Sequence, residues 1–288
     1  MAEIKTQPSY KRQRFLLGFI QQLQKGATAT DLQKLVFLYT MKEKSDTYEF
    51  MPYKYGSYSF QLAEDIEILN RDGYLTTDAS RIKAVDIYKF GPLYPIASER
   101  GNSLIRKAYR EYPYYTKNSE ILDRLFDAEE AQRIRRTREK YVQHEQILFT
   151  IGYEGKSVEA FINTLIQNDV RLLVDVRKNP LSRKFGFSNK KLEHILETAG
   201  IKYVHTPDLG IESGKRNSLN TMDDYRHLFE GYKKSLSSCT REVERVYSLL
   251  NANVRIALMC YEKEPEMCHR HVLKEYMDET YEMRSADL

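Results

Sequence analysis

The chain has 288 residues, of which 41% are hydrophobic and 30% are charged, and this composition excludes a disordered or a fibrous protein. Its length corresponds to two domains of roughly 100–200 residues each. No stretch approaches the ~18 consecutive apolar residues of a membrane span, and the polar residues 1–8 lack the apolar middle of a signal peptide. Three cysteines, an odd number in a long chain, argue against a disulfide scaffold. We therefore expect a cytoplasmic protein with no membrane partner.

The formal net charge of +4 lies entirely in the first half of the chain. Residues 1–146 contain 24 Lys and Arg against 20 Asp and Glu, whereas the rest contains 21 of each. An excess this small does not establish a nucleic-acid partner, because phosphate binding needs a clustered patch. One such cluster is the basic strip Arg133, Arg135, Arg136 and Arg138. It is either a strip that contacts phosphates or a solvated helix face.

Residues 1–97 are expected to form a mostly helical domain that ends in a β-ribbon. Apolar residues recur at helical spacing in the segments 15–23, 32–38 and 60–69. Two strand-like runs follow at residues 74–77 and 85–90, separated by a polar turn. Three helices and then a two-stranded ribbon are the order of a winged helix. Residues 98–146 are predicted to form a helical connector of two helices, broken at Tyr112 and Pro113.

From residue 147 to residue 288 the pattern alternates between strands and helices. Apolar strand-like runs occur at residues 147–151, 171–176, 202–205 and 255–260. Helical segments lie between them, including a long one over residues 225–250, and a last helix begins near Pro265. This alternation predicts an α/β domain with a Rossmann-like parallel sheet and right-handed crossovers. In such sheets the functional residues collect at the carboxyl ends of the strands.

Each predicted strand ends in a cluster of polar residues. The four clusters are Gly152-Tyr-Glu-Gly155; Asp175-Val-Arg177 with Pro180, Arg183 and Phe185-Gly-Phe187; His205-Thr-Pro-Asp208; and Cys260-Tyr-Glu262 with Cys268-His-Arg270. One cluster alone would be read as a turn or a cap. Four at one edge of a sheet indicate a site.

The same residues resemble a known family. Thr150-Ile-Gly-Tyr-Glu-Gly155, Val174-Asp-Val-Arg177, Tyr203-Val-His205 and Cys260-Tyr-Glu262 with Cys268-His-Arg270 are similar, in this order, to domain of unknown function 488. The resemblance spans about residues 147–280 and implies a fold but no established reaction. The first domain is more weakly similar to amino-terminal winged-helix modules. The resemblance also implies a bacterial setting among DNA-repair or phage-defence genes.

Most of the clustered residues have side chains that can bind or process a nucleotide. Guanidiniums and open backbone at a strand-to-helix turn bind phosphate, and the candidates are Arg177, Arg183, Arg270, Gly152 and Gly155. Carboxylates and a histidine supply acid–base groups, and the candidates are Asp175, Glu154, Glu262 and His205. Aromatic rings stack on bases, and the candidates are Tyr153, Phe185 and Phe187. A structural salt bridge between Asp175 and an arginine is the alternative.

Cysteine chemistry is the second interpretation of the site. Cys268 at a helix start would have its thiol pKa lowered by the helix dipole, and Arg270 would add positive charge. Cys260, Cys268 and His269 are weak candidates for metal ligands, because Cys260 and Cys268 lie eight residues apart and paired zinc cysteines usually lie two to four apart. We therefore expect no cofactor, zinc included.

The leading hypothesis is a protein directed at a nucleotide or a nucleic acid, most simply an enzyme that hydrolyses or transfers at a base–sugar or phosphate bond. The first alternative is a non-catalytic sensor or regulator of modified DNA or nucleotides. The second is a sulfur-transfer or redox enzyme that uses Cys268. The expected partners are a nucleic acid and a nucleotide or modified base. A homodimer is a further possibility.

Overall fold

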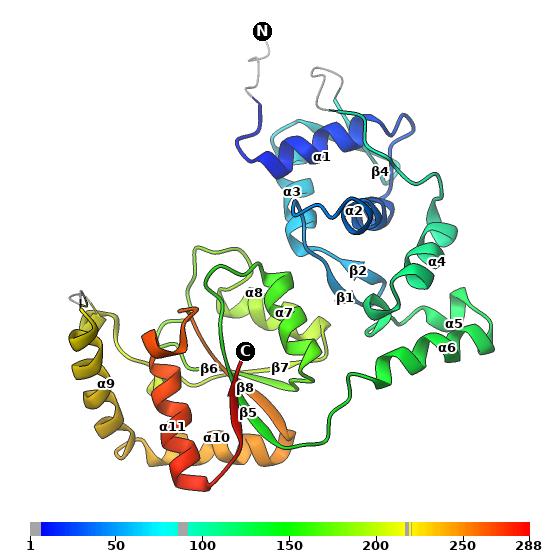
Figure 1. Ribbon diagram of the computed structural model, residues 1–288. Coiled ribbons are helices and arrows are strands. Elements are labelled where there is room, and N and C mark those ends of the chain that lie inside the picture. The colour runs from blue at the N-terminus through cyan, green and yellow to red at the C-terminus, as the bar shows by residue number, and fades with distance from the viewer. Residues whose placement is uncertain (1–6, 86–91, 217–218, 220) are drawn as a thin grey trace. The chain divides into compact units, whose positions relative to one another are not determined.

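The computed structural model describes residues 7–85, 92–216, 219 and 221–288, without the side chains of Arg138, Ser213 and Arg216. The chain divides into two compact units, Met1–Arg138 and Glu139–Leu288 (Figure 1). Most of the segment predicted as a connector thus belongs to the first unit. Within the described residues, no helix combines the length and the apolar character needed to cross a membrane.

The first unit is mostly helical and has two short antiparallel hairpins. In chain order, its described elements are α1 (Lys11–Gln21), α2 (Ala29–Glu43), β1 (Met51–Tyr53), β2 (Gly56–Tyr58), α3 (Phe60–Arg71), β3 (Leu75–Asp78), β4 (Arg81–Ala84), α4 (Gly101–Glu111), η1 (Pro113–Thr116), α5 (Leu122–Leu125) and α6 (Ala128–Glu139), which runs one residue past the unit boundary. The three predicted helices are present as α1, α2 and α3. The hairpin β1–β2 lies between the second and third of these helices.

The β-ribbon of this unit differs from the prediction in its second strand. The sequence places that strand at residues 85–90, but β3 pairs with Arg81–Ala84, in the register Leu75↔Ala84 to Asp78↔Arg81. Ala79 and Ser80 have φ of 46° and 67°, which is the backbone of a tight two-residue hairpin turn. The polar turn is therefore shorter than predicted, and the strand begins earlier. Residues 86–91 lie outside the described residues.

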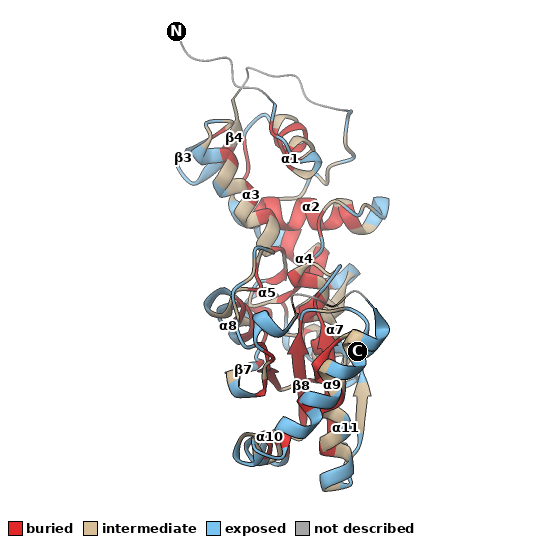
Figure 2. Ribbon diagram, turned by 90° about the vertical axis from the view of Figure 1, so that its left-hand side faces the viewer, coloured by how far each residue is buried: buried red, intermediate tan, exposed pale blue. Residues whose placement is uncertain are grey.

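Helix α2 is the centre of the first unit's core. Thr28 caps it by accepting a hydrogen bond from the Asp31 N–H. Leu32, Leu35 and Phe37 on this helix are at most 1% exposed and belong to one apolar cluster with α1 and α3 (Figure 2). A helix buried around most of its circumference lies in a core rather than on a surface.

The second unit is an α/β domain built on a five-stranded parallel sheet. Its described elements are β5 (Ile147–Gly152), α7 (Val158–Gln167), β6 (Leu172–Asp175), α8 (Asn189–Thr198), β7 (Lys202–His205), η2 (Pro207–Leu209), η3 (Ser213–Arg216), α9 (Met222–Leu236), α10 (Thr240–Asn253), β8 (Arg255–Cys260), η4 (Pro265–Met267), α11 (His269–Tyr281) and β9 (Ser285–Asp287). The strand order is β7-β6-β8-β5-β9, and every pairing is parallel. The predicted α/β fold and its parallel sheet are confirmed.

Helices cover both faces of this sheet. In Figure 1, α7 and α8 lie on one side of the strands and α9, α10 and α11 lie on the other. Leu148, Val174 and Leu258 pack with the second group of helices in one apolar cluster. Strands β5, β6 and β8 are buried along their whole length, as expected for a parallel sheet that is covered on both faces.

Two elements of the second unit differ from the prediction. The helix expected over residues 225–250 is two helices, because the chain breaks between Leu236 and Thr240. The strand β9 was outside the prediction, and it pairs with β5 in the register Leu148↔Ser285 to Thr150↔Asp287. Its three residues, Ser-Ala-Asp, carry no strand-like apolar pattern.

The register of the sheet places the predicted strand ends at one edge. Asp175 lies opposite His205 on β7 and Met259 on β8, and Gly152 lies opposite Cys260. The loops that follow β5 and β8 therefore start side by side. They lead to α7 and α11 on opposite faces of the sheet, which is the arrangement around the ligand crevice of open α/β sheets.

Candidate functional site

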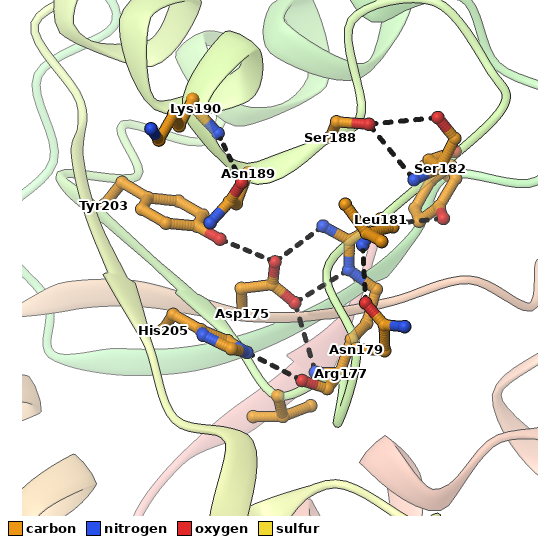
Figure 3. Close-up of polar contacts among 12 residues, drawn as sticks. Asp175, Arg177, Asn179, Leu181, Ser182, Ser188, Asn189, Lys190, Tyr203 and His205 are labelled. Carbon is orange, nitrogen blue, oxygen red and sulfur yellow. Dashed lines mark hydrogen bonds and ion pairs between the residues drawn. The ribbon is translucent and has the colours of Figure 1, made fainter. Parts of the chain in front are cut away.

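Asp175, the last residue of β6, holds the guanidinium of Arg177 in a buried ion pair. The Asp175 side chain is 0% exposed and that of Arg177 is 6% exposed. Arg177 Nη2 donates to Asp175 Oδ2 at 2.6 Å and Arg177 Nε donates to Oδ1 at 2.8 Å, so the contact is bidentate. The Arg177 backbone N–H also donates to Oδ1, at 3.1 Å (Figure 3). Burial alone would lower the pKa of Arg177, but the hydrogen bond and charge of Asp175 raise it overall.

Two side chains from the neighbouring strand β7 complete this arrangement. The Tyr203 hydroxyl donates to Asp175 Oδ2 at 2.7 Å, and His205 Nε2 donates to the Arg177 carbonyl oxygen at 2.8 Å (Figure 3). Burial raises the pKa of Tyr203, and the charge of Asp175 raises it further, so the hydroxyl stays protonated. Asp175 thus accepts four hydrogen bonds. A carboxylate occupied in this way positions other groups rather than moving protons.

Tyr153 and Phe187, predicted to stack on a base, instead stack on each other. Their ring centroids are 4.3 Å apart with an angle of 12° between the planes. Tyr153 is 4% exposed and Phe187 is 0% exposed, so Phe187 is not available to a base. The Tyr153 hydroxyl accepts a hydrogen bond from Arg177 Nη1 at 3.0 Å. Phe185 is half-buried, and Lys191 Nζ lies 4.2 Å from the centre of its ring.

A small cavity lies at this edge of the sheet, against the Arg177 side chain. Its volume is about 210 Å³. The residues that line it are Tyr153, Arg177, Lys178, Asn179, Leu181, Ile211, Cys260 and Tyr261. Lys178 and Tyr261 are exposed, at 39% for the lysine side chain and 45% for the tyrosine, and so can reach a ligand from the rim.

Sequence reasoning assigned no role to Lys178, Asn179, Tyr203 or Tyr261. Tyr203 precedes His205 by two residues on one strand, so the two-residue period of a strand places both on one face. That period could have identified Tyr203 as a partner of the strand-end cluster. Lys178 and Asn179 directly follow Arg177 in a loop, where no periodicity exists.

Gly152 allows the loops after β5 and β8 to approach each other. A Cβ at position 152 would lie 1.9 Å from the backbone oxygen of Glu262, which no other residue could tolerate without a backbone shift. Tyr153 N and Glu154 N both donate to the Tyr261 carbonyl oxygen, at 3.1 Å and 2.9 Å. Gly155 has φ of +76° and open space beside its Cα. The predicted glycines therefore shape the loop, Gly152 by a close approach and Gly155 by its backbone conformation.

The other predicted acids and arginines have separate environments. Glu154 is exposed, and its Oε2 accepts a hydrogen bond from Lys263 N at 3.0 Å. Glu262 is half-buried, with Oε2 at 3.4 Å from Cys260 Sγ. Arg183 is exposed. Arg270 is 1% exposed and is not among the residues that line the cavity.

Two cysteines and a histidine lie close together, and one of them, Cys260, also lines the cavity. Cys260 and Cys268 are each 1% exposed, and neither forms a disulfide. His269 Nδ1 lies 3.7 Å from Cys260 Sγ and 4.0 Å from Cys268 Sγ. Burial raises the pKa of the Cys268 thiol well above its usual value, and the neighbouring Cys260 raises it further. The expectation that the helix start lowers this pKa is therefore wrong, because desolvation dominates.

The basic strip lies on α6 in the first unit. Arg135 forms an ion pair with Asp123, and Arg133 Nη2 is 3.9 Å from Glu130 Oε1. Arg136 is exposed, and the side chain of Arg138 lies outside the described residues. Acidic residues therefore accompany two of the four arginines, which weakens the case for a phosphate-binding patch.

The fold and the site define the second unit as an α/β domain with a polar cavity at the carboxyl edge of a parallel sheet. The family model described as "Domain of unknown function DUF488" matches residues 157–277, within the second unit. The resemblance seen in the sequence motifs is thereby confirmed. No curated protein and no solved structure matches the chain.

Proposed function

We propose that the second unit binds the phosphate-bearing end of a nucleotide, or of a nucleic-acid chain, in the cavity beside Arg177. The observation that carries this proposal is a guanidinium held in place at the wall of the cavity. Asp175 and Tyr153 fix three of its nitrogens, so little rotamer entropy is lost when a ligand binds.

The chemistry of the cavity wall supports an anionic ligand. A guanidinium has five N–H donors, and the bonds to Asp175 and Tyr153 use three of them. Asp175 neutralises the charge of Arg177, and Lys178, whose Nζ lies 3.5 Å from Asp208 Oδ1, is the second cation that an anion in the cavity can contact. Asn179 adds an amide that can donate or accept a hydrogen bond.

The size of the cavity limits what it can hold. A volume of about 210 Å³ is below the roughly 300–1,000 Å³ of a site for a drug-sized ligand. It is enough for a phosphate and part of a sugar, and the base would then extend to the rim. Tyr261, exposed at that rim, takes the stacking role that the sequence assigned to Tyr153 and Phe187.

If the protein is an enzyme, the reaction that we propose for it is hydrolysis or group transfer at a base–sugar or phosphate bond. Glu154 and Glu262, on the loops after β5 and β8, are the acid–base candidates for it. Asp175 is a positioning residue in this scheme. A protein that binds the nucleotide without turnover would be the sensor or regulator considered above.

Calorimetric titration tests the binding proposal. The probes are nucleoside mono-, di- and triphosphates of both sugar types, short single-stranded oligonucleotides and inorganic phosphate. We expect Lys178→Ala to weaken binding about fivefold to tenfold, because a part-exposed charged contact contributes about 1 kcal/mol. Tyr261→Ala should weaken nucleotide binding but leave phosphate binding unchanged.

Lys233→Ala is the matched control for Lys178→Ala. Lys233 lies on α9 with its side chain 47% exposed and pairs with Glu279 at 3.0 Å, whereas Lys178 pairs with Asp208 at 3.5 Å. The control should bind every probe as the unaltered protein does. The proposal fails if no probe binds, or if Lys178→Ala and Lys233→Ala have the same affinity.

A further inference from the structure

Three metal-ligating side chains converge in the interior of the second unit. Cys260 ends β8, Cys268 precedes α11, and His269 begins that helix. One ligand atom from each, the two Sγ atoms and a ring nitrogen, lie within 4.8 Å of one another, and all three residues are buried. The eight-residue spacing of the cysteines is no obstacle, because the loop after β8 folds back through η4 and returns Cys268 to the strand end.

The spacing of these atoms is close to that of a tetrahedral zinc site. Zn–S bonds of about 2.3 Å and Zn–N bonds of about 2.0–2.1 Å place the sulfur and nitrogen ligands roughly 3.5 Å apart. His269 Nδ1 is 3.7 Å from Cys260 Sγ and 4.0 Å from Cys268 Sγ. Glu262 Oε2 accepts a hydrogen bond from Cys260 Sγ at 3.4 Å but is not part of the group of three.

The hydrogen bond of His269 fixes the tautomer that a metal needs. Its Nε2 donates to the Val176 carbonyl oxygen at 3.1 Å, so in the neutral ring Nδ1 carries the lone pair. That lone pair is on the side of the two sulfurs. A ring N–H bonded to a backbone carbonyl is the usual outer-shell partner of a metal-bound histidine.

The buried side chain of Arg270 lies next to this cluster. Its donors reach Thr150 Oγ1 at 3.2 Å and the carbonyl oxygens of Glu262 and Lys263 at 2.6 Å and 2.9 Å. Thr150 Oγ1 in turn donates to Asp287 Oδ1 at 2.6 Å, and this nearby carboxylate compensates the charge of Arg270. Arg270 therefore holds the loop after β8 in place beside the three ligands.

We propose that Cys260, Cys268 and His269 bind one Zn²⁺. Each thiol releases its proton when the ion binds, so two protons leave for each Zn²⁺. The three protein ligands join the end of β8 to the start of α11, and a water molecule completes the tetrahedron. Because Cys260 also lines the cavity, the metal would fix one wall of it.

Cobalt substitution tests the proposal on the full chain, without any nucleotide. The protein is reduced, freed of metal with a chelator and titrated with Co²⁺. We expect sulfur-to-cobalt charge-transfer bands in the near ultraviolet and intense tetrahedral d–d bands in the visible, both lost on addition of Zn²⁺. Elemental analysis of the protein purified without chelator should give about one zinc per chain.

Substitutions assign the ligands. Cys268→Ser and His269→Asn should abolish the tetrahedral bands. Cys239→Ser is the control, because Cys239 is a free thiol outside the cluster and its loss should leave the spectrum unchanged.

If a variant does not fold, metal binding is tested on the unaltered protein by its Tm. After chelation, Zn²⁺ should raise its Tm, because a ligand that binds only the folded state stabilises that state. Absence of cobalt bands together with an unmoved Tm would overturn the proposal and leave a thiol–imidazole hydrogen-bond cluster. Neither result depends on nucleotide binding, so this proposal and the proposed function can fail separately.

Discussion

At the scale of single residues, the Asp175–Arg177 pair has the largest consequence for stability. The substitution Asp175→Asn keeps the side-chain volume but removes the charge that compensates a guanidinium with 6% exposure. Loss of one partner of a buried ion pair costs about 3–5 kcal/mol, because the other charge stays buried. We expect Asp175→Asn to lower the free energy of unfolding by about this amount in urea denaturation. A loss of unfolding free energy below about 1 kcal/mol would show that water reaches Arg177 and that the ion pair is exposed to solvent.

Lys34 makes the stability of the first unit depend on pH. Its side chain is 1% exposed, Nζ donates to the Ser57 carbonyl oxygen at 2.5 Å, and burial lowers its pKa from 10.5 to about 7. Between these values the unfolded chain binds a proton that the folded chain does not, so stability rises with pH across this window. The slope is at most about 1.4 kcal/mol per pH unit.

Urea denaturation of the unaltered protein and of Lys34→Met isolates this effect from the other titrating groups. The difference in unfolding free energy between the two proteins should change by more than about 1 kcal/mol between about pH 7.5 and about pH 9.5. Relative to the unaltered protein, Lys34→Met should gain the most unfolding free energy at the lower pH. At that pH the lysine amine of the unaltered protein takes up a proton when the chain unfolds. A constant difference would place the Lys34 pKa near its ordinary value.

At the scale of elements, the sequence predicted β5, β6, β7 and β8 of the parallel sheet and missed β9. β5, β6 and β8 are apolar and fully buried, so their composition identifies them. β9 is Ser-Ala-Asp at the end of a helix, and only its pairing with β5 makes it a strand. Likewise, β4 begins early because Ala79 and Ser80 adopt positive φ, which their residue types do not signal.

The candidate site could be predicted in position but not in its internal contacts. Parallel strands bring their carboxyl ends to one edge, and this rule located Asp175, His205 and Cys260 together. Whether Arg177 reaches a ligand or its neighbour Asp175 depends on side-chain rotamers, which the strand pattern does not specify. The distance between Cys260 and Cys268 depends in the same way on the path of the loop between them.

The loops after β5 and β8 contact each other, and this contact depends on Gly152. In Gly152→Ala the new Cβ would meet the Glu262 backbone oxygen at 1.9 Å, and the neighbouring atoms are also backbone, so no side chain can move aside. We expect a loss of about 3 kcal/mol or more in urea denaturation, at the upper end for overpacking. Gly155→Ala, at a position with open space but φ of +76°, should cost only about 1 kcal/mol. Equal costs for the two variants would show that the loops can separate.

At the scale of the whole molecule, each unit has its own apolar core. One cluster of the first unit includes Leu16, Phe37 and Leu104, and a second includes Tyr109 and Ile134. The cluster of the second unit runs from Leu148 to Met277. A unit of about 150 residues is large enough to bury some 68–70% of the surface of its unfolded chain, which a stable single domain requires.

We therefore expect residues 139–288 to fold without residues 1–138. All five strands of the parallel sheet, the cavity and the cysteine–histidine cluster lie within this fragment. Urea denaturation of the isolated fragment should be cooperative, with one transition that coincides by circular dichroism and by tyrosine fluorescence. The fragment should also give the same tetrahedral cobalt spectrum as the full chain if the cluster binds metal. A fragment that unfolds gradually, or that needs the first unit to be soluble, would show that the second core is not self-sufficient.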